Sequence, residues 1–472
     1  MQPPIPSEVD VLVLGAGLAG HCAAIAAAEG GASVLLLEKA GEHGGSSALA
    51  AGGFAFAGTD LQKQAGVEDD PRALGEDLLK AGERMNDPAL VELFVARQLE
   101  AYEFLRDHGV KFTLNAKVPK GTIARVHAAG PGQAVNALHA AMASLPRITY
   151  VTNAAGRKLV RAGLDGPVQG AVIEHDGRTF TVHARRAVIL ATGGFSRNRE
   201  LLATYAPELL AGFTHGGIAN TGDGLIMATA LGAKHRDLGY VAGTFGGAVT
   251  YPDLPDRGAL MNHPLVFATA AGAILVNNLG ERFADESLNY KAISAIGSKQ
   301  QGGIALQILD SAMLDRWSPN GGAQDGGKAK REIVDNLMKK AVTIGDLAAQ
   351  LGIDPDRLQA TVARYNADAT TGVDRQFGRR TDRFDAGPAM CIDKPPFYGI
   401  AVGNMITSTY GGLWVSPRME VLDVFDQRID RLLAAGELVG GFHGASYLSG
   451  SALSKAAISG LEAARTALAI AG

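Results

Sequence analysis

The chain has 472 residues, of which 47% are hydrophobic and 19% are charged, so it is long enough for two or more folded domains. Its formal net charge of −4 gives no reason to expect nucleic acid or an anionic membrane as a partner, and two cysteines, Cys22 and Cys391, are too few for a disulfide framework or a thiolate metal site. The N-terminus resembles no secretion leader and no apolar run approaches roughly 18 residues, so we expect a soluble, cytoplasmic protein without membrane insertion.

The first predicted elements form a strand–helix–strand unit over residues 9–39, VDVLVLGAGLAGHCAAIAAAEGGASVLLLEK. Gly15, Gly17 and Gly20 have the GxGxxG spacing that lets backbone approach a pyrophosphate at a helix N-terminus. Glu38 ends the second strand, where a carboxylate can accept hydrogen bonds from a ribose. The unit predicts dinucleotide binding; the alternative is a glycine-rich strand-to-helix turn that binds nothing.

Later segments carry further motifs. The small residues GGSSALAAGG at 44–53 suit backbone wrapped against an extended cofactor, and AVILATGGFSRN at 187–198 is a second apolar strand that ends in a glycine pair. Four more motifs follow in order: TGDG at 221–224, GAILVNNLGERFADE at 272–286, TYGGLWV at 409–415 and AAGELVGGFHG at 434–444. With these motifs the sequence resembles the fumarate reductase/succinate dehydrogenase flavoprotein superfamily over nearly its whole length.

The resemblance implies an α/β fold with a discontinuous, Rossmann-like FAD-binding domain, residues 1–240 and 396–472, and an inserted α+β capping domain, residues 241–395. Within the insert, 245–330 is expected to be largely irregular, with 321–330 as an exposed loop. An amphipathic helix is predicted at 328–341, and a helical pair at 343–369 has Pro355 near the start of its second helix.

The resemblance also assigns FAD-binding residues. Glu38 is expected to bind the adenosine ribose, and Asp223 and Glu437 to contact the ribose or ribityl region, although each could be only a structural turn or cap. The full expected set is Gly15, Gly17, Ala19, Gly20, Glu38, Lys39, Gly45, Ser46, Ser47, Gly52, Gly53, Thr192, Gly193, Gly194, Asp223, Glu437, Ser451 and Leu453. Succinate dehydrogenases attach the flavin to a histidine where this chain has Ser46, so FAD is expected to be noncovalent. His43 lies outside that register and is expected to be an exposed loop residue.

A long helix is predicted from SGSALSKAAISGLEAART, residues 449–466. In the superfamily this helix directs its N-terminus at the flavin N1 and C2 carbonyl. A helix N-terminus carries roughly half a positive charge, which favours the negative charge of the reduced flavin. We therefore expect this helix to make FAD a better hydride acceptor.

The substrate side departs from fumarate reductases at three positions. Tyr447 occupies the place of an arginine that binds a substrate carboxylate, Thr269 that of an arginine proton donor, and Ser408 that of a carboxylate-binding histidine. Because a dicarboxylate needs bidentate cationic partners, fumarate or succinate is not expected as the substrate.

Tyrosine at 447 is instead similar to 3-ketosteroid dehydrogenases and related cyclic-ketone desaturases, whose motif is Tyr-x-Gly-x-Gly. There the tyrosine hydroxyl and the final glycine amide polarise a ketone oxygen; here the second partner is the amide of Ser451. Tyr290, at the end of GERFADESLNY, matches those enzymes' tyrosine base. Either tyrosine could instead only pack beside the cofactor.

The expected function is FAD-dependent desaturation of a small or medium, cyclic ketone, with Tyr447, Tyr290 and Ser451 as the catalytic residues and an unidentified electron acceptor. Two rivals stay open: reduction of an activated C=C bond, and a flavin-binding electron-transfer subunit without a small substrate. Weaker substrate-site candidates are Tyr410, His443, which could make only a structural hydrogen bond, and Tyr251 and His263, which could be surface-loop residues. No metal site is predicted.

Overall fold

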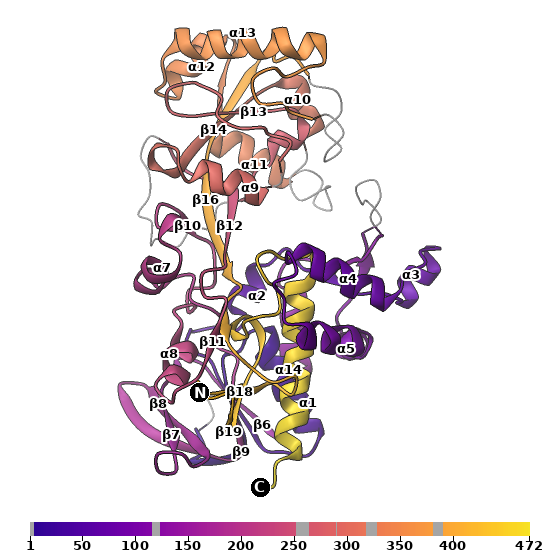
Figure 1. The fold of residues 1–472 in the computed structure, drawn as a ribbon, viewed down its shortest axis with the longest axis vertical. Coiled ribbons are helices and arrows are strands. Elements are labelled where there is room, and N and C mark those ends of the chain that lie inside the picture. Colours follow the sequence, from indigo (N-terminus) through magenta and orange to yellow (C-terminus); the bar gives the residue numbers. More distant parts are fainter. Residues whose placement is uncertain (1–3, 116–122, 252–263, 289, 318–327, 381–389) are drawn as a thin grey trace. The chain divides into compact units, whose positions relative to one another are not determined.

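The structure, a computed structural model, describes residues 4–115, 123–251, 264–288, 290–317, 328–380 and 390–472. The chain folds as two compact units (Figure 1). The first unit contains Met1–Ala206, Gly216–Val241 and Ser408–Gly472, and the second contains Pro207–His215 and Ala242–Thr407. Within the described ranges, no helix combines the length and the apolarity needed to cross a membrane.

The first unit is built on an eight-stranded sheet in the order β18-β19-β9-β1-β2-β6, in which β8 also pairs with β9 and β7 pairs with β8. The strands are β1 (Glu8–Leu14), β2 (Val34–Leu37), β6 (Ile148–Val151), β7 (Ala154–Arg161), β8 (Val168–His175), β9 (Arg178–Leu190), β18 (Glu420–Leu422) and β19 (Arg428–Ala434). The five strands β19, β9, β1, β2 and β6 run parallel. Their continuous apolar runs, such as VLLL in β2, are those of a sheet buried on both faces.

Helices α1 (Leu18–Glu29) and α14 (Ser451–Ala469) pack side by side in this unit (Figure 1). A Cβ on Gly460 of α14 would lie 2.4 Å from the carbonyl oxygen of Ala19, so the two backbones approach each other closely there. The unit's other elements are α2 (Gly45–Leu49), β3 (Gly53–Ala55), α3 (Asp60–Gln64), α4 (Pro71–Ala81), α5 (Pro88–Asp107), β4 (Thr113–Leu114), β5 (Val126–Ala128), α6 (Gln133–Met142), α7 (Arg199–Tyr205), α8 (Asp223–Thr229), β11 (His235–Arg236), β17 (Gly412–Leu413) and the short helix η5 (Gly436–Leu438).

The second unit has a six-stranded sheet in the order β10-β16-β14-β13, with β12 and β15 also paired to β16. Its strands are β10 (Phe213–Thr214), β12 (Val241–Ala248), β13 (Ile274–Val276), β14 (Ile304–Asp310), β15 (Lys339–Ala341) and β16 (Phe397–Thr409). Its helices are α9 (Tyr290–Gly297), α10 (Ser311–Arg316), α11 (Lys328–Leu337), α12 (Ile344–Gln350) and α13 (Pro355–Thr371), with short turns η1 (Pro207–Leu209), η2 (Ala268–Ala271) and η3 (Gln301–Gly303). The chain passes between the units within β12 and β16.

Several predicted elements are confirmed. The strand–helix–strand unit is β1, α1 and β2, and the helical pair is α12 and α13, with Pro355 as the first residue of α13. The predicted helix at 328–341 is shorter, because α11 ends at Leu337 and residues 339–341 form β15. The expected loop at 321–330 lies outside the described residues up to 327, and 328–330 belong to α11.

The expectation that 245–330 is largely irregular was wrong. This segment contains β13, α9, β14 and α10, and β14 is buried along its whole length. Its sequence IALQILD is a continuous apolar run interrupted only by Gln307, whose side chain bonds the backbone of Ala268 and Val266. A strand buried on both faces lacks the alternation that marks an exposed strand, and glycines on either side concealed it.

Candidate active site

The glycine-rich turn between β1 and α1 has the geometry that a nucleotide-binding loop requires. A Cβ on Gly20 would lie 1.9 Å from the Gly15 carbonyl oxygen, and Gly15 has φ +106° and closes against Ala191, so neither position accepts a side chain. Gly17 differs, because the nearest atom to its Cβ is the Ser47 hydroxyl at 3.6 Å. The backbone at Gly17 is therefore open at the N-terminus of α1, where a pyrophosphate gains from the helix dipole.

The serines of the 44–53 segment cover this helix terminus. The Leu18 amide donates to Ser47 Oγ at 3.2 Å, and the Gly217 amide donates to Ser46 Oγ at 3.0 Å. Glu38 is buried, and its two carboxylate oxygens accept from the amides of Ala16, at 2.9 Å, and Ala40, at 2.8 Å. These contacts bring together the predicted phosphate-covering and ribose-binding residues at one end of the parallel sheet.

Lys39 and Asp223, both expected to bind the cofactor, also bind each other. Lys39 Nζ lies 2.8 Å from Asp223 Oδ2 and 2.5 Å from Thr221 Oγ1, while Thr221 donates to Asp223 Oδ1 at 2.7 Å. The pair is partly buried. Its contact joins the turn at residues 39–40 to the start of α8. Asp223 thus has a structural contact of its own, although no side chain of the described residues caps α8, and its contact with the cofactor stays a prediction.

Two buried oxygen atoms near the ATGG turn fit a cofactor that is rich in hydroxyl groups. Among the residues that the structure describes, Thr192 Oγ1 and Asn220 Oδ1 have no hydrogen-bond partner. Asn220 Nδ2 donates to Glu437 Oε1 at 3.2 Å, and the Thr409 amide donates to the same oxygen at 2.8 Å. Burial raises the pKa of Glu437, and these hydrogen bonds oppose the rise. The open front of Gly17 and the two unpaired oxygens suit the pyrophosphate and sugar hydroxyls of FAD.

The N-terminus of α14 bears on one predicted assignment. Gly450, with φ +85°, precedes the helix without a side-chain cap, but both the amide and the hydroxyl of Ser451 donate to the Leu448 carbonyl, at 3.0 and 2.7 Å. In this structure the Ser451 amide is thus bonded within the chain, and its role as a donor to a ketone oxygen stays a prediction. The sequence missed this bond because it depends on the turn at 448–451 and not on residue type. Leu453 is buried in the first turn of the same helix, and its contact with the cofactor stays a prediction.

Tyr447, Tyr410 and His443 form an aromatic cluster just before α14. The ring centroids lie 5.8 Å apart for Tyr447 and Tyr410, 6.0 Å for Tyr447 and His443, and 5.3 Å for Tyr410 and His443. Tyr410 and His443 are buried, whereas Tyr447 is half-buried. The sequence ranked Tyr410 and His443 as weak candidates, yet they contact the ring of the predicted carbonyl-binding tyrosine.

The remaining substrate-side candidates belong largely to the second unit. Tyr290 is the first residue of α9, but its side chain lies outside the described part of the chain. Thr269 lies in η2, and Tyr251 packs against the hydrophobic core of this unit. His263 lies outside the described residues, and Ser408 is half-buried in β16 within the first unit.

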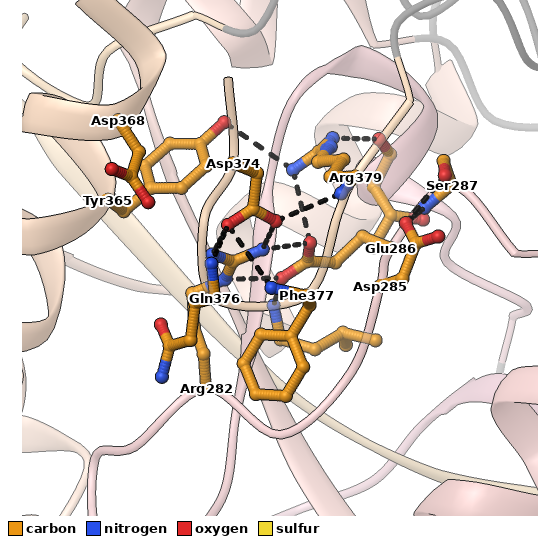
Figure 2. Close-up of polar contacts among 12 residues, drawn as sticks. Arg282, Asp285, Glu286, Ser287, Tyr365, Asp368, Asp374, Gln376, Phe377 and Arg379 are labelled. Carbon is orange, nitrogen blue, oxygen red and sulfur yellow. Dashed lines mark hydrogen bonds and ion pairs between the residues drawn. The ribbon is translucent and has the colours of Figure 1, made fainter.

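A buried ion-pair network joins residues 282–287 to residues 374–380 in the second unit (Figure 2). The Arg282 guanidinium binds Glu286 at 2.7 Å and Asp374 at 2.9 Å, and none of the three side chains is more than 4% exposed. Arg379 donates to the Thr269 carbonyl at 2.9 Å, and the Arg380 amide donates to Ser287 Oγ at 3.0 Å. Burial would raise the pKa of Asp374, but the hydrogen bonds from Arg282 outweigh it and lower this pKa to about 2.

Sequence reasoning missed Lys455, one helical turn after Ser451. Its ammonium is buried and donates to the Val439 carbonyl at 2.6 Å, near the half-buried Glu437. Burial lowers the pKa of Lys455 to about 7, and the negative charge of Glu437 opposes the shift. The sequence did contain a signal for this position. Lys455 follows Ser451 by four residues on the predicted helix, and residues with that spacing lie on the same helix face.

His43 also differs from its expectation as an exposed loop residue. It is half-buried, its ring stacks on His139 with centroids 3.8 Å apart, and its Nε2 lies 2.9 Å from Asn136 Oδ1. His139 lies on α6, 96 positions further along the chain, so no local pattern could have revealed the pair.

Comparisons with known proteins agree with this geometry. Residues 10–453 match the family described as "FAD binding domain". The chain is 32% identical over 450 residues to "Fumarate reductase (cytochrome)" of Shewanella frigidimarina, covering 94% of this chain and 74% of that protein. It is 27% identical to "3-oxosteroid 1-dehydrogenase" of Mycobacterium tuberculosis, covering 93% and 94%.

Among solved structures, the open conformation of a flavocytochrome c3 fumarate reductase superposes with a TM-score of 0.85 at 30% identity, covering 98% of this chain and 78% of that one. The family match concerns FAD binding, and the two relatives are a reductase of fumarate and a dehydrogenase of 3-oxosteroids. The chain therefore belongs to the FAD-binding flavoprotein family that includes fumarate reductase, and it is an FAD-dependent oxidoreductase that acts on CH–CH groups.

Proposed function

We propose that the protein introduces a double bond α,β to the carbonyl of a small or medium, cyclic ketone. The observation that carries this proposal is the cluster of Tyr447, Tyr410 and His443 just before α14. Two phenols and an imidazole offer hydrogen-bond donors to a neutral carbonyl, whereas a carboxylate is better held by the bidentate cations that fumarate reductases use. The likeness to 3-oxosteroid 1-dehydrogenase supports the same substrate class.

Desaturation of a ketone removes a proton from the α-carbon and a hydride from the β-carbon. Bound FAD supplies the hydride acceptor, at N5. The chain must stabilise the negative charge that develops on the carbonyl oxygen, and Tyr447 O–H is the proposed donor to that oxygen. Because the Ser451 amide is bonded to Leu448, the following amides of the first turn of α14 are the remaining backbone donors.

Tyr290 remains the proposed base for the α-proton. A phenol has a reference pKa of about 10, so its surroundings must lower that value for it to act near neutral pH. Arg379 donates to the carbonyls of Thr269, Gly272 and Ala273, and the Arg380 amide donates to the Ser287 hydroxyl, so hydrogen bonds join the 269–273 and 287 segments to residues 379 and 380.

A second candidate function is reduction of an activated C=C bond, and the 32% identity to a fumarate reductase favours it. The same carbonyl contact serves both directions, because a donor to the carbonyl oxygen also activates a conjugated alkene toward hydride. A separate electron donor would then have to reduce the flavin, and its identity is a further part of this alternative.

Anaerobic titration of the yellow holoprotein separates the two directions. If desaturation is right, cyclohexanone-type or steroid ketones bleach the flavin, and an artificial acceptor then gives turnover. If bleaching needs a chemical reductant, and enones or fumarate-like alkenes then restore the yellow colour, the protein is a reductase. A flavin that responds to none of these compounds would contradict both functions and favour an electron-transfer subunit.

A further inference from the structure

Three histidines from three elements meet directly behind the nucleotide-binding turn of the first unit. His21 lies on α1 and is fully buried, His139 lies on α6, and His43 lies in the segment that leads into α2. His21 Nε2 is 3.2 Å from His139 Nδ1, and the rings of His139 and His43 are stacked at 3.8 Å with an interplanar angle of 10°. None of the three belongs to the predicted cofactor or substrate set.

The hydrogen bonds assign the protons of three neutral rings. His21 Nδ1 lies 2.9 Å from the Gly17 carbonyl, which can only accept, so Nδ1 carries the proton and Nε2 accepts. His139 must then donate from Nδ1 to His21, which leaves a lone pair on its Nε2. His43 donates from Nε2 to Asn136 Oδ1, which leaves a lone pair on its Nδ1. Each half-exposed ring therefore has one nitrogen that acid can protonate.

The cluster fastens the loop that covers the phosphate site. Gly17 is the open glycine of the turn, and His21 binds its carbonyl from one helical turn away. His43 immediately precedes Gly44, whose amide donates to the Ala16 carbonyl at 2.9 Å, and Ser46 and Ser47 follow. The stack of His43 on His139 thus ties the start of α2 to α6.

We propose that His21, His139 and His43 are positioning residues that hold the FAD pyrophosphate loop closed only while all three imidazoles are neutral. With neutral rings, one stack and two hydrogen bonds join α1, α6 and the 39–45 segment. When His139 and His43 are both protonated, two cations face each other across the stack and separate it. Acid therefore breaks the contact between α6 and the segment at residues 39–45, and FAD binding becomes weaker.

The other titratable groups around the cluster do not reverse the expected direction, in which acid weakens FAD binding. They are Cys22 on α1, Glu38 and Glu42 in the segment after β2, and Tyr150 on β6, whose ring lies 4.9 Å from His139. Glu38 is already bound by two backbone amides, and both glutamates act on Tyr150, whose pKa burial raises further. Burial and then His43 lower the pKa of His139, and burial lowers the pKa of His21 to about 3.

The direction follows from linkage. Burial in the closed loop lowers the pKa of His21 and of His139 below the reference value of about 6.5, so the closed loop is favoured above that pH and is lost as pH falls below it. Each extra proton bound by the released state changes the FAD dissociation constant by up to about tenfold per pH unit. The FAD dissociation constant can be measured by diluting FAD-loaded protein at pH values between 8 and 5.5 and detecting the fluorescence of released FAD. We expect this constant to rise by at least about tenfold from pH 8 to pH 5.5.

Variants separate this role from a general loss of structure. His43→Phe keeps a stacked ring that cannot be protonated, so two cations can no longer face each other, and the ratio of the FAD dissociation constants at pH 5.5 and pH 8 should fall below the wild-type ratio. His43→Gln should lower the same ratio, because one of the two protons is gone, while the buried His21 and the half-buried His139 keep part of the pH dependence. His43→Lys places a permanent cation beside His139 and should weaken FAD binding at both pH values.

The matched control is His183→Gln, which removes an exposed histidine of β9 from the same unit and should keep the wild-type ratio. Thermal melting of each FAD-free variant at pH 8 checks that it is folded. If wild-type protein binds FAD equally well across this range, or if His43→Phe retains the full acid weakening, the proposal is wrong. These measurements need no substrate, so they are independent of the proposed reaction.

Discussion

Arg282 and Asp374, 92 positions apart in the sequence, form a bidentate pair in which two guanidinium nitrogens donate to the two carboxylate oxygens at 3.0 and 2.9 Å. Glu286 occupies the remaining side of the guanidinium, so one cation is shared by two buried carboxylates (Figure 2). Arg282→Met would leave both carboxylates buried without their main partner. We expect it to lower the free energy of unfolding by about 3–5 kcal/mol.

Urea unfolding of Arg282→Met measures this loss. Arg157→Met is the matched control, because its partner Glu174 and Arg157 itself are 45% and 48% exposed, and the pair should contribute less than about 1 kcal/mol. Equal losses in the two variants would show that the network is no more stabilising than a surface pair.

Gly17 and Gly20 should respond differently to substitution although they lie three residues apart. Gly20→Ala forces a methyl group to 1.9 Å from the Gly15 carbonyl and should destabilise the protein with or without FAD. Gly17→Val has room in the FAD-free protein but obstructs the face open to a pyrophosphate. It should raise the FAD dissociation constant by tenfold or more, about 1.4 kcal/mol, with little change in the melting temperature of the FAD-free protein. An unchanged FAD affinity in Gly17→Val would place the pyrophosphate elsewhere.

Tyr447→Phe tests the proposed donor to the ketone oxygen. Loss of one such donor typically lowers turnover by about 10²-fold or more, so the ketone that bleaches the flavin should be oxidised at least that much more slowly. The rate of dye reduction under saturating ketone gives the measurement. Tyr205→Phe, on α7 of the same unit, should keep the wild-type rate. Wild-type turnover in Tyr447→Phe would mean that this ring only packs against Tyr410 and His443.

Lys455→Met tests the buried ammonium on α14. The pKa of Lys455 is lowered to about 7, whereas the unfolded chain keeps its proton up to about pH 10. Over this window the unfolded state binds more protons, so the free energy of unfolding of the wild type should rise as pH increases from 7 to 9. Below pH 7 the full cost of burying the charge applies.

The variant should lose that rise, and urea unfolding at pH 6.5 and pH 9 gives the difference. Lys158→Met removes an exposed lysine of β7 and should retain the wild-type pH dependence. If the free energy of unfolding of Lys455→Met rises as much as that of the wild type between pH 6.5 and pH 9, another group causes the rise.

What the sequence predicted well is local. The strand–helix–strand unit follows from an apolar run, three glycines and an alanine-rich helix within 31 consecutive residues, and all three elements are present. The helical pair α12 and α13 follows equally from periodicity and from Pro355. In both cases the residues that determine the structure are neighbours in the chain.

What the sequence could not predict depends on distant partners or on one dihedral angle. The stack of His43 on His139 and the clamp of Arg282 on Asp374 join positions that only the tertiary fold brings together. The Ser451 amide turns to Leu448 because of the local backbone at 448–451, which residue types alone leave undetermined. The roles of Tyr447 and Tyr290 stay predictions, because they concern a substrate.

The close packing of α14 on α1 sets a limit on how early this protein can mature during synthesis. The glycine turn that starts α1 leaves the ribosome well before its helix partner, which lies more than 420 positions later in the chain. Until residues 451–469 emerge, the apolar flank of α1 has no cover, and a nascent chain has to be kept from aggregating. We therefore expect stable loading of the cofactor only after residues 451–469 have been synthesised.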